Sequence, residues 1–278
     1  PILRTSSESF TVRLADERES GSYTAYLKRD ARKKSIGKIY INIVEDIDFK
    51  PDAGTTVYGI VSSAGVGVEN VVVSDGAEVT VTNEKGIYQL KSAKKWGYVF
   101  ISVPSGYEVP SVGVLPQFHR ALKNSADVVE RADFKLEKVD GQDSYKIFML
   151  GDMHLANRTG DLGQFAQFTS DLTDYMTRHK GEKMYALTLG DMTWDLYWYS
   201  NSYYFPQYLN TVNSQIKNLQ IFHTMGNHDN DFQTRSDYDA AVKYVDQICP
   251  TYYSFNIGKV HYVVMDDIDC SLSLIHIS

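Results

Sequence analysis

The sequence predicts a multi-domain protein in which all-β sandwich modules precede an α/β domain. Three observations carry this prediction. The chain has 278 residues, of which 43% are hydrophobic, so it is long enough for several packed cores. Up to about residue 139, short alternating segments are separated by Gly and Pro turns. From Tyr145 onward, apolar strand-like segments instead alternate with stretches of helical spacing.

Composition excludes several classes of partner. The formal net charge of −7 argues against a nucleic-acid-binding surface and against attraction to anionic membranes. We expect no transmembrane segment, because no apolar run approaches the length of a membrane span. The two cysteines, Cys249 and Cys270, leave the redox compartment open, and the oligomeric state is open as well.

Both ends of the chain are expected to be truncated. Residues 1–50 read as the C-terminal part of a β-domain, with strands near 10–14, 21–27 and 38–43. Residues 271–278 break the character of what precedes them and resemble the translated end of a sequencing-library adapter. We therefore expect a non-native tail there and exclude it from the site.

Residues 52–139 are predicted to form a β-sandwich module. Strand-like segments are expected at 56–61, 68–74, 79–82, 87–90, 98–103 and 132–137. Turn signals such as Asp75-Gly76-Ala77 and Asn83-Glu84-Lys85-Gly86 separate them. A polar linker at 140–144 follows, so the boundary is placed near residue 142.

Residues 145–270 carry the α/β pattern. Apolar strands at 146–150, 185–189 and 219–225 each run into a short polar loop. Helices are expected over 162–176, over 204–218 and after a capping box at Ser236-Asp237-Tyr238-Asp239. A hairpin is expected around a turn at Asn256-Ile257-Gly258-Lys259.

The loops after the three strands hold metal-ligating side chains. Asp152 and His154 follow the first strand, Asp191 follows the second, and Asn227 follows the third. The carboxyl ends of parallel strands meet at one edge of a sheet, so these side chains are expected to gather there. In an extended loop, side chains two apart point the same way, so Asp152 and His154 can reach one ion. Mixed oxygen and nitrogen donors favour Mn, Fe or Zn over Ca or Mg.

Glycines precede each of these loops. Gly151, Gly190 and Gly226 stand directly between the strand and the polar residues. Glycine allows a sharp exit and close backbone approach, so all three are predicted to shape the loops.

These motifs resemble a known family. Gly151-Asp152-x-His154, Gly190-Asp191 and Gly226-Asn227-His228-Asp229, in this order after apolar strands, are similar to the calcineurin-like metallophosphoesterases. The resemblance covers about residues 145–270 and implies the N-terminal half of an αββα sandwich. The turn glycines and core valines of residues 52–139 resemble a carboxypeptidase-regulatory-like, or transthyretin-like, module. Such modules precede these catalytic domains in some bacterial envelope proteins, which implies a secreted, periplasmic or envelope location.

The resemblance implies roles for individual residues. Asp152 and His154 would bind one divalent metal ion, Asp191 would bridge two ions, and Asn227 would bind the second ion. His228 would face the phosphate and assist the leaving group. Asp229 would hold or orient the His228 loop. Six residues that follow Asp191 are candidates for lining a substrate pocket, against ordinary packing of a long loop: Trp194, Asp195, Trp198, Tyr199, Tyr203 and Tyr204. The implied reaction is hydrolysis of a phosphate mono- or diester by a hydroxide held between two metal ions.

The sequence also departs from the family pattern. A further ligand histidine and a Gly-His-x-His motif are missing, because His261 lies inside a predicted strand and His276 lies in the suspect tail. With few protein ligands per ion, we expect this fragment to be nearly inactive. Two alternatives stay open: an adhesion or glycan-binding β-sandwich protein with a catalytically silent partner domain, and a nucleotidase or sugar-nucleotide pyrophosphatase of the same fold.

Overall fold

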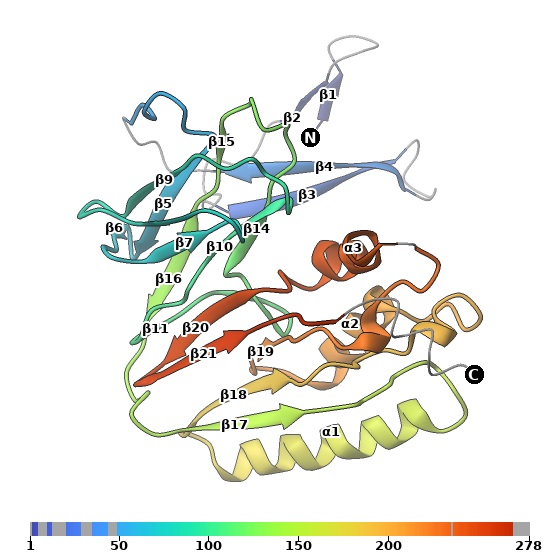
Figure 1. Ribbon diagram of the computed structural model, residues 1–278. Coiled ribbons are helices and arrows are strands. Elements are labelled where there is room, and N and C mark those ends of the chain that lie inside the picture. The colour runs from blue at the N-terminus through green and yellow to red at the C-terminus, as the bar shows by residue number, and fades with distance from the viewer. Residues whose placement is uncertain are drawn as a thin grey trace. The chain divides into compact units, whose positions relative to one another are not determined.

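A computed structural model describes residues 49–268 except Arg235, together with four strands before residue 44. The chain divides into two compact units, residues 1–51 and 52–278 (Figure 1). In the first unit, β1 pairs with β2 and β3 with β4, all antiparallel. These strands are β1 Ile2–Arg4, β2 Phe10–Val12, β3 Gly21–Lys28 and β4 Ser35–Ile43. The three strands expected in this region are confirmed, whereas the tail expected at 271–278 lies outside the described residues.

The second unit begins with two main sheets. One has the strand order β14-β10-β7-β8, and the other has the order β11-β16-β5-β15, with β6 and β9 also paired to β5. The strands are β5 Val57–Ser63, β6 Val66–Gly67, β7 Val72–Ser74, β8 Val79–Val81, β9 Ile87–Leu90, β10 Tyr98–Ile101, β11 Tyr107–Glu108, β12 Ser111–Val112, β13 Leu115–Pro116, β14 His119–Ala121, β15 Glu130–Arg131 and β16 Phe134–Lys138.

Buried and half-buried side chains alternate along most of β5, and the buried ones contribute to the core of this part. Val57 and Val61 are fully buried, and Phe134 of β16 packs into the same core. Burial of each such side chain stabilises the fold by roughly 1.5–3 kcal/mol. The strand predicted over 132–137 is confirmed, but it pairs with β5 in parallel, with Phe134 opposite Val61. The five short strands β11–β15 were not predicted.

The remainder of the unit contains a parallel sheet with the order β17-β18-β19, as the strand–loop–helix pattern predicts. Helix α1 runs along one face of this sheet, and the β20–β21 hairpin lies on the other side (Figure 1). The elements are β17 Tyr145–Leu150, α1 Asp161–Arg178, β18 Lys183–Thr188, η1 Asp195–Tyr197, α2 Phe205–Gln215, β19 Ile221–Phe222, η2 Asn227–Asp229, α3 Asp237–Gln247, β20 Tyr253–Ile257 and β21 Val260–Val264.

The predicted helices are confirmed, with shifted ends. Helix α1 buries Phe165 and Leu172, and its Tyr175 meets Phe148 of β17 edge-on at 5.7 Å between ring centroids. The N-cap of α3 is at the predicted Ser236, whose hydroxyl accepts a hydrogen bond from the Asp239 amide. No helix among the described residues is both long and apolar enough to cross a membrane.

The hairpin closes the core on the far side of the sheet. Phe255 of β20 stacks on Phe222 of β19 with ring centroids 3.7 Å apart. The turn predicted over 256–259 is shorter than expected, because β20 extends to Ile257 and β21 begins at Val260. Only Gly258, at φ +54°, and Lys259 form the turn. The described residues thus form a β-rich fold with few helices; the full αββα arrangement stays a prediction.

Candidate metal centre

Three loops at the carboxyl end of the parallel sheet build the site. They are the first rim loop (151–160), the second rim loop (189–204) and the third rim loop (223–234). Backbone hydrogen bonds tie the first to the second, from the His154 amide to Asp191 and from the Leu155 amide to Met192. The first two rim loops are therefore fixed relative to each other by main-chain contacts.

Side chains from all three loops converge. One ligand atom each from His154, Asp191 and His228 lies within 4.8 Å of the others. His154 Nε2 is 3.2 Å from Asp191 Oδ2 and 3.8 Å from an oxygen of the exposed Asp152. The group that could hold a divalent cation therefore has one nitrogen from each histidine and one carboxylate oxygen of Asp191, whereas Asp152 lies outside it. Asn227 opens η2 beside His228 and is half-buried.

The backbone at the candidate ligands is strained. Asp152, His154 and Asp191 have φ of +51°, +45° and +52°, in the left-handed region. The expectation of an extended first loop is wrong: Asp152 and His154 approach each other through two left-handed residues. Such conformations cost about 1–3 kcal/mol each and cluster at functional sites.

The three glycines that precede the rim residues differ in whether, and why, their positions require glycine. Gly190 needs the conformational freedom of glycine, because its φ of +95° lies in the left-handed region. Gly226 has an ordinary φ, but a Cβ there would lie 2.1 Å from Asp191 Oδ1. Gly151 shows neither constraint, since a Cβ would meet only Leu189 at 3.7 Å. The prediction that glycine shapes the loops therefore holds at two of the three positions.

His228 is held by two aspartates. Its Nδ1 lies 2.9 Å from Oδ1 of the buried Asp195, and its backbone amide donates to Asp191 Oδ1 at 2.9 Å. The hydrogen bond with Asp195 raises the pKa of His228, and burial opposes that rise. With Nδ1 engaged, His228 can offer only Nε2 to a ligand or a substrate.

Asp229 joins the second and third rim loops. Its fully buried carboxylate accepts hydrogen bonds from the amides of Met192, Thr193 and Gly226, and from the Thr193 hydroxyl. Burial raises the pKa of Asp229 to about 7, although these hydrogen bonds act in the opposite direction. These contacts join Asp229 to the loop that carries His228, and the role expected for it stays a prediction.

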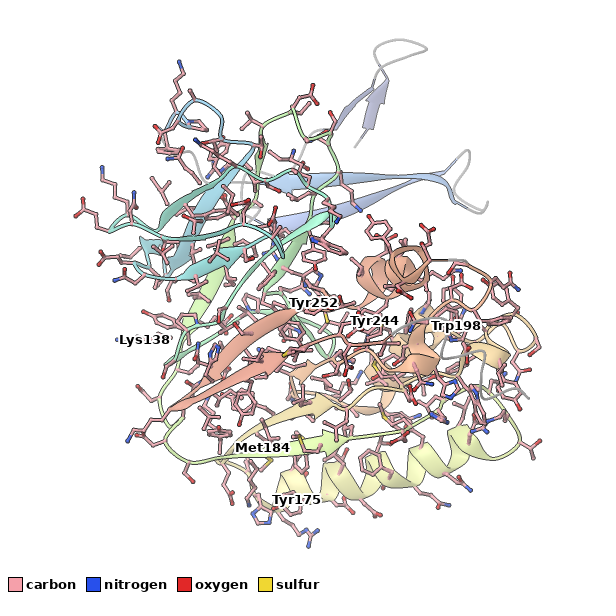
Figure 2. All side chains as sticks on the ribbon, viewed as in Figure 1. Lys138, Tyr175, Met184, Trp198, Tyr244 and Tyr252 are labelled. Atoms are coloured by element: carbon pink, nitrogen blue, oxygen red, sulfur yellow. The ribbon has the colours of Figure 1, made fainter. Side chains whose placement is uncertain are left out.

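Aromatic side chains surround and support the rim. The Trp194 ring lies 4.8 Å from the His154 ring and 5.7 Å from the His228 ring. Deeper in the fold, Trp198 and Tyr244 are buried and both contact Phe205, at 5.1 and 5.6 Å between centroids (Figure 2). The packing of the second rim loop thus rests on an aromatic core.

One residue beside the site was missed. The Arg158 guanidinium lies 4.5 Å from the Trp194 ring centroid and donates to the His154 carbonyl at 3.2 Å. A lone arginine in a polar loop carries no spacing signal, so Arg158 could not be singled out from the sequence.

These features define a β-rich protein with a metal-ligand cluster at the edge of a parallel sheet. A family model described as the N-terminal region of calcineurin-like phosphoesterases matches residues 55–139 and supports that family for the chain. The match falls on the segment likened to a transthyretin-like module; that finer likeness stays a prediction. No curated protein and no solved structure matches the chain.

Proposed function

We propose that this protein is a metal-dependent hydrolase of phosphate mono- or diesters. The convergence of His154, Asp191 and His228 from three separate loops carries the proposal. The match to the N-terminal region of calcineurin-like phosphoesterases supports the same family independently, because it lies outside these loops.

Asp152, His154, Asp191 and Asn227 would hold two divalent ions, of Mn, Fe or Zn, with Asp191 between them. The chemistry that such ions would supply is polarisation of the phosphoryl oxygens and a lower pKa for bound water. The left-handed backbone at His154 and Asp191 would hold their donor atoms close together before an ion arrives, and an oxygen of Asp152 lies 3.8 Å from His154 Nε2.

His228 would protonate the leaving oxygen from Nε2. Asp195 on Nδ1 fixes the ring orientation and favours the protonated form, which the acid role requires. Asp229 keeps the second and third rim loops in register, so that His228 and Asp191 hold their relative positions. We also propose a secreted, periplasmic or envelope location, supported only by the resemblance of the N-terminal region.

The proposal is tested first by metal binding. Calorimetric titration with Mn²⁺ should show binding that Asp191→Asn abolishes and that Asp171→Asn, on the exposed face of α1, leaves unchanged. Mn²⁺-dependent release of p-nitrophenol from its mono- and bis-phosphate should follow the same pattern. We expect slow turnover, because the cluster offers few protein ligands per ion. Absence of Mn²⁺ binding, or equal loss in both variants, would refute the metal site.

A further inference from the structure

Arg158 places a positive charge next to an acidic rim. Its guanidinium and the His154 ring both contact the Trp194 indole. Four carboxylates, those of Asp152, Asp191, Asp195 and Asp229, belong to the same rim. A phosphate ester approaching this rim meets repulsion from the acids, so an adjacent cation matters for binding.

The guanidinium is positioned by stacking, by its hydrogen bond to the His154 carbonyl and by an ion pair with Asp161. It lies over Trp194 and, at 5.6 Å, over Tyr197, and these two rings contact each other edge-on. Asp161 is 3.7 Å from Arg158 Nε, too far for a hydrogen bond. Arg158 Nε is buried without a hydrogen-bond partner among the described residues. Stacking thus fixes the plane of the guanidinium, while the Nε–H donor remains without a hydrogen-bond acceptor.

Unused donors on an ordered, half-exposed guanidinium fit an oxyanion. Arginine binds phosphate in a planar, two-pronged geometry, and a buried donor without a partner costs free energy until an acceptor arrives. The scissile phosphoryl group would lie at the His154–Asp191–His228 cluster, whereas the Arg158 guanidinium lies over the Trp194 ring beside that cluster. Arg158 is therefore placed to meet a different part of the substrate.

We propose that Arg158 determines substrate specificity by binding a second anionic group beside the scissile phosphate. This inference rests on the proposed function, because it assumes that one phosphoryl group occupies the metal cluster. The preferred class is then a phosphate ester or anhydride with a further phosphate, rather than a simple aryl phosphate.

The test compares two ligands that cannot be hydrolysed. Methylphosphonate carries one anionic group and methylenediphosphonate carries two. Their affinities are measured by calorimetry at one fixed Mn²⁺ concentration, so chelation in solution affects every variant equally. The variants are wild type, Arg158→Gln, Arg158→Lys and the control Arg178→Gln, an exposed arginine at the end of α1.

We expect Arg158→Gln to weaken methylenediphosphonate binding by about tenfold or more, the loss typical of a hydrogen bond to a charged group. Methylphosphonate binding should change by less than about threefold, Arg158→Lys should recover part of the loss, and Arg178→Gln should behave as wild type. Equal weakening of both ligands, with a lower melting temperature, would show that Arg158 only supports the loop. Methylphosphonate binding without any preference for the diphosphonate overturns this inference alone. Failure of both ligands to bind overturns the proposed function as well.

Discussion

Asp195 and His228 form a side-chain pair that joins the second and third rim loops, with 2.9 Å between Asp195 Oδ1 and His228 Nδ1. Asp195 is buried, whereas His228 is half-buried and also receives the field of Asp191. A buried carboxylate behind an imidazole fixes its tautomer and stabilises the imidazolium form. The pair therefore prepares His228 to donate a proton.

Replacing Asp195 with Asn should lower the pKa of His228. Because the pKa of His228 is raised in the folded protein, the Asp195–His228 pair stabilises the fold. This stabilisation is fully present at pH values below the unfolded-state pKa of histidine. That stabilisation is lost as pH rises through the folded-state value. NMR titration of the His228 Cε1 proton measures the shift directly, without metal or substrate. An unchanged titration in Asp195→Asn would show that Asp195 does not control the protonation of His228.

Gly226→Ala should destabilise the protein and weaken Mn²⁺ binding. The added Cβ would lie 2.1 Å from Asp191 Oδ1 and 2.2 Å from the Asp191 amide, so the second rim loop must move. Gly163→Ala is the matched control: it lies in α1 with nothing within 4 Å of its Cβ. That control should gain about 0.5–1 kcal/mol from helix propensity. Urea unfolding and Mn²⁺ titration of both variants test this prediction. Equal stability and equal Mn²⁺ affinity of the two variants would contradict it.

Asp229→Ala should lower stability by about 1–3 kcal/mol, because buried donors in two loops lose their acceptor. Asp246→Ala, an exposed aspartate of α3, should have no effect beyond a few tenths of a kcal/mol. Thermal melting of both variants at neutral pH checks the difference. A melting temperature for Asp229→Ala equal to that of Asp246→Ala would mean that the loops are held by other contacts.

His223 should make the protein acid-labile. Burial lowers the pKa of His223 to about 3, and its Nε2 lies 3.1 Å from the Tyr208 hydroxyl. The unfolded chain binds this proton more readily, so stability is complete above about pH 6.5. It falls as pH drops toward 3, by at most about 1.4 kcal/mol per pH unit. His223→Gln should flatten this slope in urea unfolding at several pH values, whereas His261→Gln, at an exposed histidine, should not. Parallel slopes for all three proteins would contradict the prediction.

The sequence predicted the parallel sheet and its rim loops because apolar strands running into Gly-Asp or Gly-Asn carry a strong local pattern. It could not predict the left-handed backbone at Asp152, His154 and Asp191, because those conformations are imposed by contacts between loops. The same applies to the stack of Arg158 on Trp194, whose partners are far apart in the chain.

The β-sandwich part was predicted less completely. Strands with clean alternation, such as β5 and β16, were found, but the two- and three-residue strands β11–β15 were not. Segments this short have no measurable period, and their pairing depends on neighbours supplied by the rest of the fold. The parallel pairing of β16 with β5 is likewise a property of topology and not of local pattern.

The backbone link between Val103 and the β20–β21 hairpin has a consequence for dissecting the protein. Val103 pairs with Phe255 in a parallel bridge and accepts a hydrogen bond from the Asn256 amide, while Ile221 donates to Val114 in the same way. Cutting the chain at the linker would leave the backbone amides of Asn256 and Ile221 without these hydrogen-bond partners, and would expose two strand edges. Exposed strand edges pair with other chains and promote aggregation. Expressing residues 145–268 alone should therefore yield aggregates, whereas residues 52–268 should melt in one cooperative step.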